Sequence, residues 1–223
     1  MSWVLDNLGL IAQLSVEHLR QSAVAIILGF VISLPIGWLA FRYTPLRGTV
    51  LTTIGLLYTI PSFALFAVLS LFGVPYLSET NLVIALTIYA MAIMTRSVTD
   101  GLTSVDPVTR GAAVAVGFGA WRRFWVVDFP LAGPVVLAGL RVTAVSTISL
   151  ATVGTLIGVQ NLGYLFTNGA QRHIVAEILA GVVAVVLIAL LIDLLLVLAG
   201  RVLMPWTRQV REGRPVRAEV AAT

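Results

Sequence analysis

The chain has 223 residues, of which 59% are hydrophobic and 11% charged, with a formal net charge of +4 and a mean hydropathy of +1.01. These values exclude an ordinary soluble domain and indicate an all-α, polytopic membrane protein. The sequence contains no cysteine and no lysine, which excludes disulfides, thiolate metal sites and a phosphate-binding loop ending in Gly-Lys-Ser/Thr. If ATP drives this protein, another chain therefore hydrolyses it.

Residues 1–21 form the first predicted element and are too polar to cross a bilayer. Asp6, Glu17, His18 and Arg20 are spread through them, while apolar residues recur at helical spacing. The segment is therefore predicted to be an extracytoplasmic helix that lies along the membrane interface. It lacks the basic start and apolar core of a signal peptide.

Long apolar runs follow, and they predict about five membrane-spanning helices. The runs cover residues 22–41, 49–72, 82–94, 134–159 and 178–198, and the third is expected to continue as helix past Arg96. Pro61 interrupts the second run and is predicted to kink its helix. Residues 22–200 thus form the predicted transmembrane domain, and residues 201–223 form a basic cytoplasmic tail.

The stretch from Gly111 to Pro134 lies in the predicted loop of residues 97–133, between two spans. Six of its residues recur at intervals of three and four, so a helix would gather them on one flank: Ala112, Ala113, Val116, Gly117, Ala120 and Phe124. Their mostly short side chains would let another surface approach the backbone closely. Two interpretations stay open, a short helix that docks onto a partner and an amphipathic helix that lies on the lipid surface.

This stretch resembles the EAA loop of permease subunits in bacterial ABC importers, with a MetI-like core. Ala112, Ala113, Gly117, Val127 and Pro130 stand at the family's spacing, whereas Gly111 replaces the glutamate and Phe129 the leucine. The resemblance implies a coupling helix seated in a groove of a cytoplasmic ATP-binding subunit. The residues it assigns to this contact are Gly111, Ala112, Ala113, Val116, Gly117, Ala120, Phe124 and Pro130. Without the glutamate, the salt bridge that it would make is missing.

The likeness is greatest to permeases for glycine betaine, carnitine, choline and proline betaine. A Thr-Ile-Pro-Ser element at residues 59–62 and the run from Gly111 to Arg141 carry it. It implies a non-enzymatic transport subunit without cofactor or metal, partnered by an ATP-binding subunit, a second permease copy or paralogue, an extracytoplasmic binding protein and membrane lipid, and not by nucleic acid. Permeases for amino acids or other small solutes share the same loop, so these substrates stay open as an alternative.

The placement of the arginines predicts the orientation in the cell membrane. With five spans, twelve of the fourteen arginines fall on the side that carries the predicted loop and the tail, and only Arg20 and Arg172 fall on the other. Short loops rich in arginine face the cytoplasm. The N-terminus is therefore predicted outside and the C-terminus inside, where an ATPase could reach the loop.

Four residues are candidates for the substrate path: Pro61, Ser149, Thr152 and Asp193. The fourth span is rich in Ser, Thr and Gly and is expected to pack inside the bundle. Asp193 has two readings, a counter-charge for a cationic substrate and a structural partner of a nearby arginine such as Arg201, about two helical turns away. The structural reading is preferred because charges near helix ends can reach the headgroups.

A different class of protein must also be considered, namely a stand-alone secondary transporter or channel. Such proteins commonly contain paired inverted repeats. The sequence shows no convincing internal repeat, and ionisable residues are scarce within the spans. A membrane scaffold without transport activity would not need the spacing of Ala112, Gly117 and Pro130.

Overall fold

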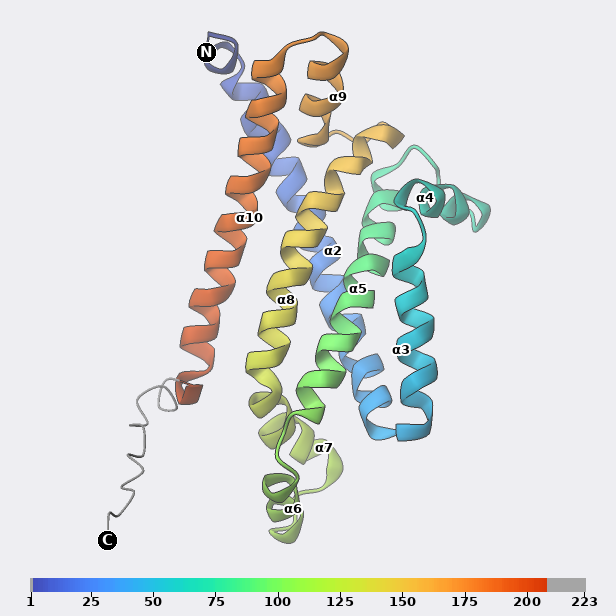
Figure 1. Cartoon of the computed structure of the whole chain (residues 1–223), viewed down its shortest axis with the longest axis vertical. Coiled ribbons are helices and arrows are strands. Elements are labelled where there is room, and N and C mark those ends of the chain that lie inside the picture. The colour runs from blue at the N-terminus through green and yellow to red at the C-terminus, as the bar shows by residue number, and fades with distance from the viewer. Residues whose placement is uncertain (1, 208–223) are drawn as a thin grey trace, which may run out of the picture.

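The computed structural model describes residues 2–207 of the chain, and no strand occurs among them (Figure 1). The helices are α1 (Ser2–Asp6), α2 (Leu8–Arg42), α3 (Thr44–Thr59), α4 (Ser62–Leu71), α5 (Glu79–Thr103), α6 (Pro107–Ala115), α7 (Ala120–Arg123), the π-helix η1 (Phe124–Asp128), α8 (Phe129–Ala151), the 3₁₀-helix η2 (Thr152–Ile157), α9 (Gly163–Gln171) and α10 (Val175–Leu203). The predicted all-α fold is confirmed.

The length and apolarity of the helices fit a protein that crosses the membrane several times. Four segments could span it, namely α2, α5, the stretch from residue 120 to 157 and α10, and the bent pair α3 and α4 could form a fifth span. In Figure 1 the N-terminus lies at one end of the bundle, whereas α6, α7 and the end of α10 lie at the opposite end. This arrangement agrees with the predicted number of about five spans.

Helix α2 shows no break at residue 21, where the sequence predicted the end of a separate interfacial helix. It continues for 35 residues because its polar side chains find partners inside the protein. His18 Nε2 lies 2.9 Å from the Ile148 carbonyl oxygen, and Gln21 donates to the Gln160 carbonyl at 3.1 Å. Residues 8–21 are thus the first part of the long helix α2.

Pro61 does more than kink the second predicted span. The axes of α3 and α4 differ by 104° across residues 60 and 61. Proline cannot donate a backbone hydrogen bond, which weakens helical continuity at this position. The Tyr89 hydroxyl of α5 donates to the Ile60 carbonyl at 2.6 Å, so the broken backbone gains a partner from the neighbouring helix.

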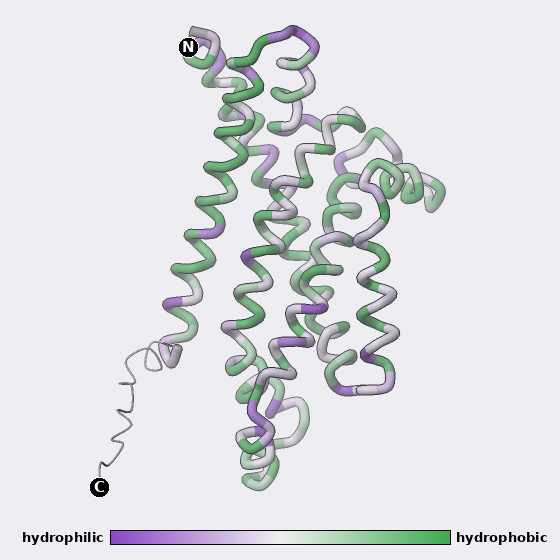
Figure 2. Tube along the Cα trace, in the orientation of Figure 1, coloured by the Kyte–Doolittle hydropathy of each residue, from purple (hydrophilic) through white to green (hydrophobic). Residues whose placement is uncertain are grey.

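Helices α2, α5 and α8 form the centre of the bundle through close contacts at glycines. A Cβ atom on Gly37 would lie 2.7 Å from the Val98 side chain, and one on Gly101 would lie 3.2 Å from the Ala132 carbonyl oxygen. Small residues in this way let membrane helices approach closely. Helix α10 lies at the side of the bundle and is hydrophobic along most of its length, with many exposed aliphatic side chains (Figure 2).

Candidate functional site

Helix α6 is defined by signals at both of its ends. The Asp106 side chain accepts a hydrogen bond from the Val108 amide at 2.9 Å, and Pro107 occupies the first turn, where its missing amide hydrogen costs little. After the helix, Gly117 has a φ of +88°, and the amide of Phe118 donates back to the Ala113 carbonyl at 3.0 Å. A left-handed residue of this kind commonly ends a helix, and glycine adopts it without strain. The helix therefore ends at Ala115, and the six residues from Ala112 to Phe124 do not lie along one continuous helix as the spacing predicted.

One side of α6 is exposed and apolar, and we call it the docking face. It consists of Val108, Gly111, Ala112, Ala115 and Val116, which are all exposed on the helix or directly after it. Val108 and Val116 are 77% and 74% exposed, although both lie outside the long helices that could contact lipid. Exposed apolar surface of this kind is typical of a contact with a partner.

The eight residues that were predicted to contact the ATPase differ in their exposure. Gly111, Ala112, Val116, Gly117 and Ala120 are exposed. Ala113 and Phe124 are only 8% and 5% exposed and pack within the chain, so they cannot lie on a shared docking surface as predicted. The reason is geometric, since successive residues of a helix point about 100° apart and Ala113 faces the bundle while Ala112 faces away.

Pro130, the last of the eight residues, lies away from the docking face. It belongs to the first turn of α8 and lines an apolar groove of about 470 Å³ together with residues of α2, α8 and α10. It begins the return of the chain into the bundle, where a proline in the first helical turn is well tolerated.

The turn at Gly117 gives a testable prediction. A leucine at φ +88° would strain the folded loop by roughly 1 to 2 kcal/mol. If 1.4 kcal/mol of this strain is lost from the contact with the ATP-binding subunit, the affinity of that contact falls roughly tenfold. Gly117→Leu is therefore expected to lower ATP-driven uptake while the protein still inserts into the membrane. Gly119→Leu is the matched control, because Gly119 has a φ of −65° and open space around its Cα. Equal uptake by the two variants would show that the turn is unimportant.

A buried ion cluster connects this loop to the long helices. Asp128, at the end of η1, has a side chain only 3% exposed, and its two carboxylate oxygens face different arginines. Arg110 Nε lies 2.9 Å from Oδ1 and Arg123 Nε lies 3.3 Å from Oδ2. Arg110 also donates to the Leu102 carbonyl of α5 at 2.8 Å, and its guanidinium lies 4.7 Å from the centre of the Phe41 ring of α2.

This cluster was not predicted from the sequence, although a signal was present. Asp128 is the only acidic residue between Asp106 and Glu177, and it lies in an otherwise apolar run. A lone carboxylate in such surroundings requires a cationic partner. Arg110, Arg122 and Arg123 were the nearby possibilities, but only the fold selects two of them.

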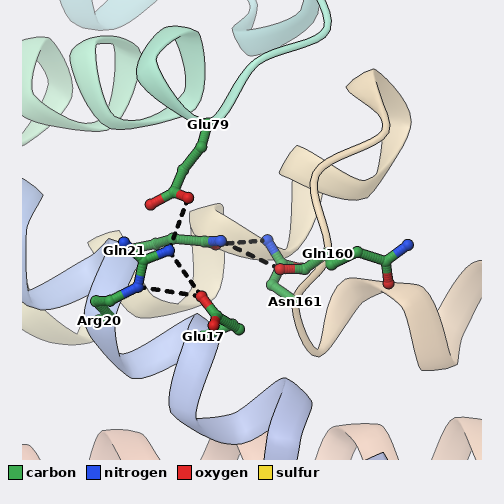
Figure 3. A network of polar contacts seen from close by, with 6 residues as sticks. All are labelled: Glu17, Arg20, Gln21, Glu79, Gln160 and Asn161. Atoms are coloured by element: carbon green, nitrogen blue, oxygen red, sulfur yellow. Dashed lines mark hydrogen bonds and ion pairs between the residues drawn. The ribbon is translucent and has the colours of Figure 1, made fainter.

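A second polar network lies at the opposite end of the bundle (Figure 3). Arg20 of α2 donates to Glu17 of the same helix and to Glu79 of α5, both at 2.7 Å. Gln21 donates to the Gln160 carbonyl at 3.1 Å and accepts from Asn161 at 3.1 Å. These contacts join the N-terminal half of α2, the start of α5 and the connection after η2, beside a polar pocket of about 320 Å³.

The four candidates for the substrate path lie on different elements. Pro61 is exposed at the break between α3 and α4, while Ser149 and Thr152 lie at the end of α8 and the start of η2. The Asp193 carboxylate receives two hydrogen bonds from Arg141, at 2.6 and 2.8 Å. The structural reading of Asp193 is thus supported, but its observed partner is Arg141 of α8 and differs from the suggested Arg201.

A helical bundle with several helices that could span a membrane and a short exposed helix at one end defines the class, a multi-pass membrane protein. The family model "Binding-protein-dependent transport system inner membrane component" matches residues 25–209. The chain belongs to this family. It is thus a component of a membrane transport system.

Known relatives cover most of the chain. The osmoprotectant import permease protein OsmW of Salmonella typhimurium is 33% identical over 198 residues, which is 87% of this chain and 92% of that protein. The glycine betaine/carnitine/choline transport system permease protein OpuCB of Bacillus subtilis is 28% identical over 92% of this chain and 94% of its own length. A solved structure of the MetNI methionine ABC transporter in an inward-facing conformation gives a TM-score of 0.80 at 20% identity, over 89% of this chain and 98% of that chain. This last likeness shows the fold alone.

Proposed function

We propose that this chain is the permease subunit of an ATP-driven ABC importer for quaternary ammonium osmoprotectants. The proposed substrates are glycine betaine, carnitine, choline and proline betaine, delivered by an extracytoplasmic binding protein. The observation that carries the ATP-driven mechanism is the exposed apolar face of α6, which is held at one end of the bundle in a chain without lysine. The substrate class is supported by relatives named for osmoprotectants, glycine betaine, carnitine and choline.

In the proposed mechanism two permease copies, identical or paralogous, line a path between them. Each docking face contacts one ATP-binding subunit, and closure of the ATPase dimer draws the two loops together. The bundle then changes from inward-open to outward-open and accepts substrate from the binding protein, and hydrolysis resets it. Such a cycle requires the ATPase to bind the two conformations with different affinities, because a partner can shift an equilibrium only by its differential affinity.

The test is uptake by proteoliposomes that contain this permease, its ATP-binding subunit and its binding protein. Labelled glycine betaine, carnitine, choline and proline betaine are each supplied with and without internal ATP, and amino acids are supplied as competitors. We expect uptake of at least one quaternary ammonium compound that depends on both ATP and the binding protein. Uptake of amino acids alone would support the alternative substrate, and uptake without ATP would indicate a secondary transporter.

The proposed orientation places the N-terminus outside the cell and the C-terminus in the cytoplasm. It rests on the excess of arginine at the end of the bundle that carries α6 and α7. A reporter fused after Thr207 is expected to be active in the cytoplasm, and one inserted at Asn168, in α9, outside. Activity of both reporters on the same side would contradict five spans.

Pro61, Ser149 and Thr152 stay proposed contacts on the substrate path, because each is at least partly exposed. The natural sequence has no cysteine, so a single cysteine at any of these positions would be unique. Protection of that cysteine from a membrane-impermeant thiol reagent by substrate would support the assignment. Labelling that is unaffected by substrate would remove the position from the path.

A further inference from the structure

We propose that Arg110 and Asp128 are positioning residues that transmit the movement of the docking face to the membrane helices. The inference rests on the proposed function, since it concerns the step between ATPase contact and movement of the bundle. It assigns that step to a specific joint, the ion cluster that Asp128 forms with Arg110 and Arg123. Neither the family likeness nor the loop spacing points to these residues.

Several elements of the fold meet at the side chain of Arg110. This residue belongs to α6, the helix that carries the docking face. Its guanidinium bonds to Asp128 just before α8, donates to Leu102 near the end of α5, and lies over Phe41 near the end of α2. One side chain of the loop thus contacts α2, α5 and the residue that directly precedes α8.

The contacts in the cluster are hydrogen bonds between charged groups. Apolar contacts are non-directional, so a helix held only by them can slide over its neighbour. Hydrogen bonds between charged groups weaken steeply when distance or angle changes, and burial strengthens them electrostatically. The Asp128 side chain is 3% exposed and the Arg110 and Arg123 side chains are each 19% exposed, so water competes little for these bonds. A displacement of α6 is therefore passed to its partners and is not lost by sliding.

The backbone directly before α8 has an unusual helical form. Residues Phe124–Asp128 form a π-helix, in which the Phe129 amide donates to the Phe124 carbonyl five residues earlier. The wider turn places Asp128 inward, facing both arginines, while Trp125 and Val126 stay exposed. Short π-helical segments are uncommon and occur frequently at functional sites. Here the segment forms the junction between the loop and α8.

The test compares variants that remove one charge and keep most of the side chain, in the full complex with the ATP-binding subunit and the binding protein. Asp128→Asn keeps the shape of the side chain and removes its charge, and Arg110→Met keeps much of the length. Arg122→Met is the matched control, because Arg122 is an exposed arginine of the same loop and lies over Phe118 at 4.6 Å. Three quantities are measured for each variant: ATPase recovered with the permease, ATP hydrolysis, and substrate taken up per ATP hydrolysed.

We expect Asp128→Asn and Arg110→Met to recover the ATPase and to hydrolyse ATP, while uptake per ATP falls roughly tenfold, a typical size for lost coupling between sites. Arg122→Met should keep the wild-type ratio. A merely structural role would lower protein yield, hydrolysis and uptake together and leave the ratio unchanged, and that result would overturn the proposal. Failure of the wild-type permease to recover the ATPase would instead overturn the proposed function.

A milder variant covers the possibility that the first two variants do not fold. Arg110→Lys keeps the charge but cannot reach Asp128 and Leu102 together with the fork of a guanidinium. It is expected to accumulate normally and to show an intermediate loss of uptake per ATP. If Arg110→Lys has the wild-type ratio, or if all three variants fail to accumulate, the cluster does not transmit movement and the proposal is wrong.

Discussion

Ala112→Glu is expected to remove the ATP-binding subunit from the purified complex. Ala112 lies at the centre of the docking face, between Val108 and Val116, and its side chain points away from the bundle. A glutamate there would hold two apolar surfaces apart or bury a charge without a partner. Burying a group without a partner costs roughly 2 kcal/mol or more, so recovery of the ATPase should fall on the order of thirtyfold.

Val114→Glu is the matched control for this experiment. Val114 is 52% exposed on the same helix and points about 160° away from Ala112. The same charge at this position should leave recovery of the ATPase largely unchanged, as judged by affinity purification of tagged permease. Equal recovery with both variants, or equal loss, would show that the exposed face of α6 is not the specific contact.

Removing either member of the Arg141–Asp193 pair is expected to reduce the amount of folded protein in the membrane strongly. The two bonds of 2.6 and 2.8 Å join α8 to α10 within the spanning segments. A single neutral substitution leaves one charge inside the membrane without its partner, which is costly. Arg141→Leu and Asp193→Leu should each lower the melting temperature in detergent and the yield from membranes.

The double variant Arg141→Leu/Asp193→Leu is expected to recover most of that stability. Replacing both charges by apolar residues removes the unpaired group, and such replacements of ion pairs are often neutral or stabilising. Uptake then separates the two roles of Asp193. A stable double variant that transports normally confirms a structural role, whereas a stable double variant without uptake of a cationic substrate would assign Asp193 to the substrate path.

Composition and hydropathy were sufficient to predict the general architecture. The apolar runs correspond to the observed long helices, because a bilayer demands about twenty apolar residues for each span. The spacing around Gly117 suggested a continuous helix, whereas the structure turns there at a φ that few residues other than glycine adopt. Pro61 could be predicted to disturb its helix, but the bend of 104° could not. The Tyr89 hydroxyl meets the backbone at this bend, and Tyr89 is far away in the sequence.

The sequence placed the candidate site in the stretch from Gly111 to Pro134, and its contact with a partner stays a prediction; the sequence did not show which of its residues are exposed. Spacing along α6 gives the angles between residues but not the direction of the bundle, so Ala113 could not be distinguished from Ala112. The pairing of Asp128 with Arg110 depends on a loop that returns over eighteen residues, and local pattern contains no information on such closure. The polar residues up to position 21 suggested a helix along the membrane interface. The sequence could not show that His18 and Gln21 are buried, because their partners belong to distant segments.

The uneven burial of the long helices has a consequence for biosynthesis. Helix α5 carries buried polar residues such as Asn81, Thr95 and Thr99, and Thr99 donates to the Gly37 carbonyl of α2 at 3.3 Å. Such a helix is poorly solvated by lipid alone, and α2 is already synthesised when α5 leaves the ribosome. Helix α10, aliphatic and mostly exposed, can enter the bilayer without help and reaches Arg141 last. The helices are thus synthesised in an order that suits assembly. Helix α5, which needs polar partners, follows α2, and the aliphatic helix α10 comes last.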